Sequence, residues 1–387
     1  MKLSINGIKE QETWKKAGIA LPGYDVEAAS EKAKENPVWV HFGIGNIFRV
    51  FIGGIADGLL EEGVLDRGIT CVETFDYDVA DKIYDPYDNL GLSVILHGDG
   101  TREYKVVGAF AEAVKAQSSN AEQWKRLKEI FTSKSLQMVS FTITEKGYAL
   151  QKADGTWFPF VEADIKNGPD KATGAMAVLV AMLNERYKAG KYPIALVSMD
   201  NCSQNGAKLR ESVLTMTEEW HKAGFVDDGF VDYVTDEKVV AFPWTMIDKI
   251  TPRPSEQIAA DLEKLGVEDG ASVTFDKVLA VGGHFGRDAL DAGRQTKDVD
   301  GGAVESAGCY FGDGVGLALI AYGGGYCDFA GVGGREHGGG QLVGQEAVAD
   351  AVDGGLDTLV AAYGADGGEI LPYVGLLICY QALSRDI

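Results

Sequence analysis

The sequence predicts an α/β protein whose core is a Rossmann-like, mainly parallel sheet. Two observations support this prediction. Short apolar runs of strand length alternate with longer amphipathic stretches, and the first run, Val38–Phe42, passes through a glycine turn into a helix. With 387 residues, of which 45% are hydrophobic, the chain is long enough for two domains.

The glycine turn has the features of a dinucleotide-binding site. Gly43 permits a tight turn, and Gly45 lets the backbone approach a pyrophosphate, which would rest on the N–H groups at the start of the next helix. Apolar residues recur in that helix at every fourth position, at Ile47, Phe51, Ile55 and Leu59. Phe48 stands where a third glycine is usual, so an ordinary strand-to-helix turn is the alternative.

A second apolar strand, Gly68–Phe75, ends in acidic residues. In a dinucleotide fold, a carboxylate at this strand end hydrogen-bonds the adenosine ribose and repels the extra phosphate of NADP, so we expect NAD as the cofactor and NADP as the weaker ligand. Glu73 is the first candidate. Asp76 is the second, because Glu73 lies 28 residues past Gly45 rather than the usual ~20. A solvated acidic loop is the alternative.

The later elements continue the alternation of strands and helices. Residues 1–36 are polar and helix-prone, and we assign them no role. The other predicted elements are strands at Leu92–Leu96 and Tyr104–Val107, a largely helical stretch at Ala111–Ser133, a strand at Leu136–Ile143, a helix at Thr173–Lys188, a strand at Tyr192–Ser198 and a helix at Ala207–Glu219.

Polar residues follow two of these strands directly. Thr144 and Glu145 follow one strand, and Asp200, Asn201 and Asn205 follow the next. Open parallel sheets bind ligands at the carboxyl ends of their strands, and an amide can orient a hydroxyl or carbonyl without changing the proton balance. Turn capping is the alternative in both places.

A single acid, Asp248, stands in an apolar stretch that prolines bracket, Val239–Pro254. A carboxylate in such surroundings needs a partner, which Lys249, Arg253 or a substrate would supply.

The composition excludes several classes of function. A net charge of −22 argues against nucleic acid and anionic membrane as partners, because an acidic surface repels phosphate polymers. Residues 1–16 lack the apolar core of a signal peptide and no run is long enough to span a membrane, so we expect a cytoplasmic protein. Oligomeric state is left open.

Cysteine and histidine usage gives no sign of a metal site. The five cysteines are scattered without a CxxC pair, which is typical of buried thiols rather than a disulfide framework or zinc site. No histidine pair has metal-ligand spacing. His41 lies inside the first strand and is expected to be a buried core residue, whereas His97, His221 and His284 are expected at the surface or in turns.

Four segments then form one ordered pattern. They are HFGIGNIFR with Gly43, Gly45, Asn46 and Arg49, then SFTITEKGY at 140–148, MDNCSQNG at 199–206 and FPWTMIDKITP at 242–252. Together they resemble the mannitol dehydrogenase family, the polyol-specific long-chain dehydrogenases that include fructuronate and tagaturonate reductases. In the last segment, Ile247 and Lys249 replace the usual valine and arginine.

The resemblance implies metal-independent hydride transfer between a nicotinamide and a sugar alcohol or aldonate, of the mannitol/fructose or mannonate/fructuronate type. The small-molecule partner would be a sugar alcohol, ketose or sugar acid. Carried over by position, Asn201 would position the reacting oxygen, Asp248 would contact the polyol or the catalytic lysine, and His337 would be the catalytic histidine. Cofactor contacts are implied for Gly43, Gly45, Asn46, Arg49, Thr144 and Glu145.

The resemblance also divides the chain into a dinucleotide-binding domain, residues 1–254, and a mainly helical substrate and catalytic domain, residues 255–387. The second part is atypical, since 27 of the chain's 50 glycines lie after residue 269 and interior glycines weaken helices. The family's general-base lysine should precede the histidine by eight residues, where this chain has Phe329. A divergent domain, a frameshift and wrongly assigned residues would each explain the change, and we favour the last.

Two classes of function therefore remain. The first is an NAD-dependent polyol or aldonate dehydrogenase, which the retained Asn201, Asp248 and His337 favour. The alternative is a nucleotide-binding sensor or scaffold that has lost hydride transfer, because without a lysine base the carbinol proton has no acceptor.

Overall fold

The computed structural model describes residues 1–97, 100–245, 256–268 and 279–283. Its centre is a six-stranded sheet of order β6-β3-β2-β7-β8-β9, in which all neighbouring strands are parallel. The strands are Trp39–Phe42 (β2), Ile69–Glu73 (β3), Phe110–Lys115 (β6), Met138–Phe141 (β7), Ile194–Ser198 (β8) and Val240–Ala241 (β9). The direction of winding reverses between β2 and β7. This is the strand order of a doubly wound Rossmann sheet, which confirms the predicted fold class.

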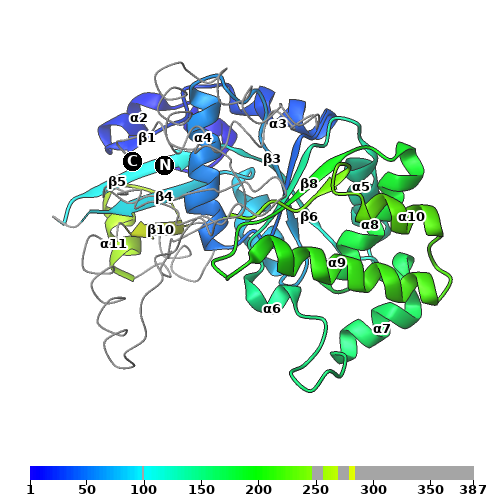
Figure 1. Cartoon of the computed structure of the whole chain (residues 1–387). Coiled ribbons are helices and arrows are strands. Elements are labelled where there is room, and N and C mark those ends of the chain that lie inside the picture. Colours follow the sequence, from blue (N-terminus) through cyan, green and yellow to red (C-terminus); the bar gives the residue numbers. More distant parts are fainter. Residues whose placement is uncertain (98–99, 246–255, 269–278, 284–387) are drawn as a thin grey trace, which may run out of the picture.

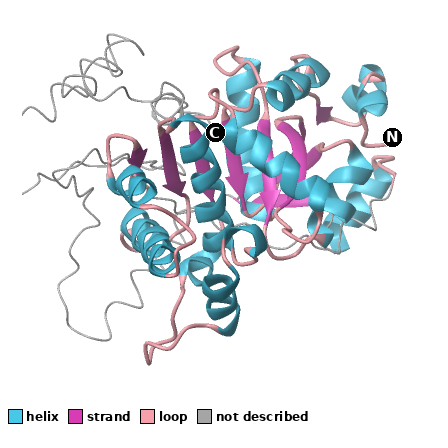
Figure 2. Ribbon diagram, turned by 90° about the vertical axis from the view of Figure 1, so that its right-hand side faces the viewer, coloured by secondary structure: helices cyan, strands magenta, loops and turns pink. Residues whose placement is uncertain are grey.

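Helices cover both faces of this sheet (Figures 1 and 2). On one face lie Ala121–Thr132 (α5), Ala175–Gly190 (α8), Asn205–Lys222 (α9) and Asp228–Thr235 (α10). On the other lie Val26–Glu35 (α3), the π-helical turn Phe48–Ile52 (η1), Gly53–Glu61 (α4) and the π-helical turn Ala80–Tyr84 (η2). Shorter elements are Thr144–Tyr148 (α6), Pro159–Asn167 (α7), Asp85–Tyr87 (η3) and Pro169–Lys171 (η4).

The strands are buried on both faces, which explains why they stand out in the sequence as unbroken apolar runs. In β2, Val40 and Phe42 pack into the core beneath α5 and α8, while Trp39 packs into the core beneath α4. In β7, Val139 points to the first core and Met138 to the second. A parallel sheet between two helical layers requires apolar side chains at successive positions.

A second, four-stranded sheet adjoins the first and has the order β1-β5-β4-β10. Its strands are Ile19–Ala20 (β1), Gly91–Leu96 (β4), Arg102–Val107 (β5) and Leu279–Gly283 (β10). The antiparallel β4–β5 hairpin is an insertion between β3 and β6. Around this sheet lie Ile5–Ile8 (α1), Gln11–Lys16 (α2) and Glu256–Lys264 (α11).

Residues 1–36, to which the sequence assigned no role, divide between the two units: α3 covers the six-stranded sheet, and the residues before it pack mainly on the second sheet. Leu3 and Trp14 are buried in its core together with Val94 of β4 and Leu262 of α11. The few apolar residues of this polar segment gave no clear signal in the sequence, because the residues that they pack against lie far along the chain.

A buried carboxylate connects the two sheets. Asp57 of α4 is fully buried and accepts hydrogen bonds from the Tyr24 hydroxyl (2.6 Å) and the Gly108 amide (2.9 Å), and its other oxygen lies 2.8 Å from Lys105 Nζ. Burial next to this carboxylate raises the pKa of Tyr24. The Asp57 carboxylate therefore joins α4 to the N-terminal segment through Tyr24 and to β5 through Lys105.

One predicted element is wrong. The stretch 111–133 was expected to be largely helical, but it begins as β6, and the helix starts only at Ala121, where the Asn120 side chain accepts from the Gln123 amide. The pairing of β6 with β3 decides its conformation. The other predicted strands and helices described above are confirmed within a few residues at their ends.

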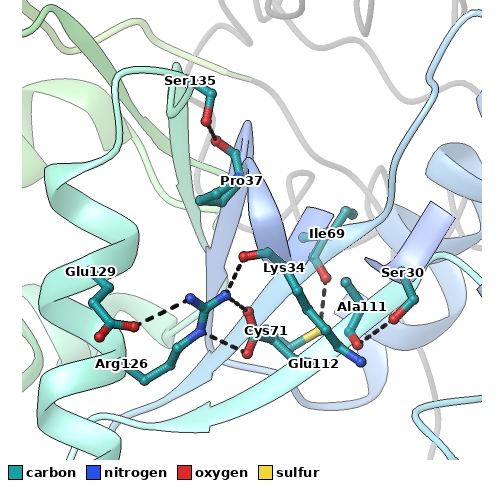
Figure 3. A network of polar contacts seen from close by, with 10 residues as sticks. All are labelled: Ser30, Lys34, Pro37, Ile69, Cys71, Ala111, Glu112, Arg126, Glu129 and Ser135. Atoms are coloured by element: carbon teal, nitrogen blue, oxygen red, sulfur yellow. Dashed lines mark hydrogen bonds and ion pairs between the residues drawn. The ribbon is translucent and has the colours of Figure 1, made fainter. Parts of the chain in front are cut away.

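At the amino edge of the six-stranded sheet, where its strands begin, side chains bind the backbone closely. Arg126 of α5 donates to both oxygens of Glu112 (2.6 and 3.1 Å) and to the Lys34 carbonyl at 2.7 Å (Figure 3). Ser135 donates to the Pro37 carbonyl at 2.7 Å, just before β7 and β2 begin. These contacts fix the entry of the central strands.

Arg186 of α8, which is fully buried, makes more of these contacts than Arg126 or Ser135. Its five N–H groups donate to five main-chain carbonyls at 2.7–3.0 Å, those of Phe131, Ser133, Leu136, Tyr192 and Pro193. One side chain thus ties the end of α5 to the loops that lead into β7 and β8.

Candidate functional site

The glycine turn follows β2 at the opposite, carboxyl edge of the sheet. Gly43 has φ +88°, and a Cβ atom there would lie 2.2 Å from the Thr142 carbonyl oxygen, so the fold itself requires glycine. Gly45 is exposed, and a Cβ atom there would meet no atom within 4 Å. The fold therefore does not require a glycine at position 45. The space above Gly45 is open and could hold a ligand.

Two side chains hold the turn from below. The buried Arg49 donates to the Ile44 carbonyl at 3.2 Å and also to Asn46 Oδ1. The Tyr84 hydroxyl donates to the same Ile44 carbonyl at 2.9 Å. The structure thus brings Asn46 and Arg49 together at the turn, as expected, and their contact with a cofactor stays a prediction.

A chain of hydrogen bonds reaches the turn through His41. Thr142 Oγ1 donates to the Gly43 carbonyl (2.8 Å), so it accepts from His41 Nε2 (2.8 Å), and His41 Nδ1 then accepts from Ser140 Oγ (2.6 Å), which itself accepts from Trp39 Nε1. Burial lowers the pKa of His41 to about 3, which keeps its ring neutral. The expected core role of His41 is confirmed.

Glu73 lies at the end of β3 and is buried. Its Oε1 accepts from the amides of Thr74 (3.0 Å), Phe75 (3.0 Å) and Asp76 (3.4 Å), and its Oε2 accepts from the Ile44 amide (3.4 Å). Desolvation raises the pKa of Glu73 despite these bonds. The carboxylate organises the turn after β3 and links it to the glycine turn.

Asp76 differs from Glu73 because its side chain is exposed. Both predicted ribose ligands therefore lie on one turn, beside the glycine turn, and which of them binds the ribose stays a prediction. The geometry makes Asp76 the more accessible carboxylate.

The ends of β7 and β8 are joined by Asp200. Its two oxygens accept from the amides of Ile143 and Thr144, both at 3.0 Å, and from the Tyr148 hydroxyl at 2.6 Å, which also contacts Ser198 Oγ at 2.8 Å. Thr144 has φ +64°, an uncommon conformation that these bonds stabilise. Burial raises the pKa of Asp200.

Asn205 is a structural residue here. Its Nδ2 donates to the Thr245 carbonyl (2.9 Å), and its Oδ1 accepts from the amides of Gly206 (2.7 Å) and Thr245 (3.1 Å). Asn201, by contrast, is exposed, and Glu145 forms an ion pair with Lys208 of α9. Asn205 thus fixes the loop after β8 to Thr245, while the side chain of Asn201 in the same loop stays accessible.

Most of the predicted site residues thus gather at one edge. Asp248 and His337 lie outside the described residues, as does His284. His97 and His221 are exposed, as expected. Cys71 is buried as expected, but Cys202 is only half-buried, which corrects the expectation for that thiol, because it lies in the exposed loop after β8.

Sequence reasoning missed Tyr148 and Thr142 as supporting residues of this edge. A tyrosine four residues after Thr144 was the only available signal for the first.

Within the described part of the chain, no group of three potential metal ligands comes together, and no helix is long and apolar enough to cross a membrane.

The family is decided by comparison with known proteins. A model of the mannitol dehydrogenase Rossmann domain matches residues 38–279. The chain belongs to the mannitol dehydrogenase family. The family resemblance inferred from four sequence segments is thereby confirmed.

Individual members of the family show how far the likeness extends. A D-mannonate oxidoreductase of Thermotoga maritima is 49% identical over 268 residues, which cover 69% of this chain and 49% of that protein. A solved D-sorbitol dehydrogenase in substrate-free form has a TM-score of 0.57 at 26% identity, covering 70% of this chain and 51% of that one. The chain spans about half the length of the relatives that it matches.

A further solved member confirms the fold. It is a Pseudomonas fluorescens mannitol 2-dehydrogenase in a ternary complex with NAD and D-mannitol, with a TM-score of 0.59 at 23% identity, covering 73% of this chain and 53% of that chain.

Proposed function

We propose that the protein is an NAD-dependent oxidoreductase that transfers a hydride between a nicotinamide and a sugar alcohol or aldonate without a metal. The observation that supports this most directly is the glycine turn. Gly43 is fixed by the fold, and Gly45 faces open space at the point where winding of the sheet reverses. That is the place where doubly wound sheets bind dinucleotides.

The described residues fit such a cofactor. Its pyrophosphate would rest over Gly45, at the start of the helical segment that begins with η1. Its adenosine ribose would lie at the end of β3, near Asp76, whose exposed negative charge favours NAD over NADP. Thr144 and Glu145, after β7, would lie on the nicotinamide side of the same edge.

The bound nicotinamide would supply the hydride acceptor, and the protein must accept the carbinol proton and orient the reacting oxygen. We assign the orienting role to Asn201, which stands exposed after β8. Asp248, near the end of the domain that we place at residues 1–254, and His337, in a substrate domain that we place at residues 255–387, complete the proposed site. The likeness to a D-mannonate oxidoreductase supports an aldonate of the mannonate type as substrate.

Substitution of Gly45 tests the cofactor site. In Gly45→Ala the new methyl group would occupy the space assigned to the pyrophosphate, so we expect the Kd for NADH, measured by its fluorescence, to rise at least tenfold while the unfolding free energy stays nearly unchanged. A control is Gly54→Ala in α4, where an added Cβ also meets nothing within 4 Å. It should bind NADH as the native protein does and gain about 0.5–1 kcal/mol of stability.

Equal NADH affinity of the native protein and Gly45→Ala would contradict the assigned site. A panel of mannonate, altronate, mannitol and arabinitol with NAD then tests the reaction, with mannonate expected to be oxidised fastest. Binding of NADH without turnover of any of the four would instead support a nucleotide sensor.

A further inference from the structure

The most exposed large apolar side chain of the described residues is Phe75, in the turn after β3, with 93% of its surface accessible. The two other exposed phenylalanines have partners. Phe160, 48% exposed, stacks on Phe158 with ring centroids 5.8 Å apart, and Phe225, 41% exposed, lies against Gly168. Exposure of an aromatic ring to water is unfavourable, so a ligand that covered the Phe75 ring would gain free energy from the contact.

The backbone beneath Phe75 is fixed. Its amide donates to Glu73 Oε1 at 3.0 Å, between the similar bonds from Thr74 and Asp76. The turn is also tied to the end of β6, because the Ala116 amide donates to the Glu73 carbonyl (2.8 Å) and the Tyr77 hydroxyl donates to the Ala116 carbonyl (3.2 Å). The ring thus stands on an ordered turn rather than on a loose loop.

This turn lies where the adenosine half of a dinucleotide would be. With the pyrophosphate over Gly45 and the ribose at the end of β3, the adenine attached to that ribose would lie beside the turns that follow β3 and β6. The flat base offers a π-face to any ring placed there, and base–aromatic stacking is among the stronger contacts available to a nucleotide.

We propose that the Phe75 ring forms one wall of the adenine subsite and stacks on the base. The inference rests on the proposed function, since it needs the dinucleotide to lie across the glycine turn. It assigns two tasks to the one turn. Glu73 holds the backbone, while Phe75 and the exposed Asp76 contact adenine and ribose.

Binding measurements with ligands that contain or lack adenine test the assignment. For Phe75→Ala we expect the Kd values for NADH and for ADP-ribose to rise about tenfold, from the lost stacking. Binding of reduced nicotinamide mononucleotide, which has no adenine, should not change. Phe75→Tyr should retain the native affinities, because it keeps a stacking ring.

Phe225→Ala is the matched control. It removes another partly exposed phenylalanine, located after the end of α9 and therefore at the amino edge, and it should leave all three affinities unchanged. Thermal unfolding of each variant establishes that it is folded, and we expect almost no change in Tm for Phe75→Ala.

The outcomes separate this inference from the proposed function. If the native protein binds NADH and Phe75→Ala binds it equally well, the adenine assignment is wrong and the dinucleotide site stands. A clear fall in Tm of Phe75→Ala with unchanged NADH affinity would show that the ring packs against protein instead, which also overturns it. Native protein that binds neither NADH nor ADP-ribose would refute both proposals.

Discussion

The two edges of the six-stranded sheet use buried polar groups in different ways. At the amino edge, Arg186 and Ser135 donate to main-chain carbonyls, and Arg126 closes over Glu112. At the carboxyl edge, buried carboxylates accept from main-chain amides, as Glu73 and Asp200 do. The contacts at the amino edge hold the start of the strands in place. Those at the carboxyl edge shape turns whose outer residues, such as Phe75 and Asp76, are exposed.

This difference separates residues that maintain the fold from those that we propose to contact a ligand. A buried cation with every donor satisfied has nothing to offer a substrate. A buried anion that holds a turn can instead position neighbouring residues toward solvent, here the side chains of Phe75 and Asp76 and the backbone of Gly45. The charge at the carboxyl edge therefore acts through the backbone it positions.

Removal of the Arg186 guanidinium should have the largest effect. Arg186→Met leaves five main-chain carbonyls without their donors, those of Phe131 and Leu136 in buried positions, so we expect the unfolding free energy, measured in urea, to fall by about 4 kcal/mol. Where the variant is folded, its affinity for NADH should match that of the native protein, because the change lies at the amino edge.

The control is Arg210→Met in α9. Arg210 pairs with Glu237 at 3.0 Å on the surface, with both side chains substantially exposed, so its loss should change stability by less than ~1 kcal/mol. Similar losses in the two variants would show that the backbone contacts of Arg186 contribute little, and the contrast between the edges would then fail.

The pH dependence of stability tests the hydrogen-bond chain through His41. Its pKa of about 3 in the folded state lies below the ordinary value of 6.5, so the unfolded chain binds the proton more readily between these values and stability falls as pH falls through this window. We expect His41 to account for a loss of about 2 kcal/mol between pH 7.5 and 5.

Urea unfolding of the native protein and of His41→Gln at both pH values isolates this effect. Glu73 and Asp200 have raised pKa values and act in the opposite direction, but they are present in both proteins. The variant should lose less stability on acidification. Equal losses of unfolding free energy in the two proteins would show that folding does not lower the pKa of His41, and the hydrogen bonds assigned from His41 to the glycine turn would then be wrong.

The smallest expected effect concerns the choice between cofactors. In Asp76→Asn, loss of the exposed charge should bring the Kd for NADPH several-fold closer to that for NADH, since repulsion at an exposed site is screened by salt. Asp228→Asn, at the start of α10 and far from the carboxyl edge, is the matched control. An unchanged ratio of the two affinities in Asp76→Asn would direct attention back to Glu73.

The sequence predicted those elements whose identity is local. The strands β2, β7 and β8 are short apolar runs, and Gly43 and Gly45 mark the turn without any knowledge of the partners. β6 was missed because its sequence, FAEAVK, mixes polar and apolar residues, and only its pairing with β3 makes it a strand.

The supporting contacts of the site were beyond prediction for a related reason. Trp39 and Ser140 are 101 positions apart, and Tyr148 and Asp200 are 52 apart, so no spacing rule connects them. Sequence reasoning identified Glu73 as a candidate ribose ligand, but it could not show that four amides already bind its carboxylate.

The small sheet has a consequence for the order of folding. The strands β2, β3, β6, β7 and β8 all lie within residues 39–198, whereas the small unit needs Arg102 to pair with Asp261, and the Glu268 amide to reach the Met1 carbonyl. Contacts of such separation form late, because closing a long loop costs entropy before any contact repays it. During synthesis, we expect the six-stranded sheet to form first, and the contacts that need Asp261 and Glu268 to form only after those residues have been synthesised.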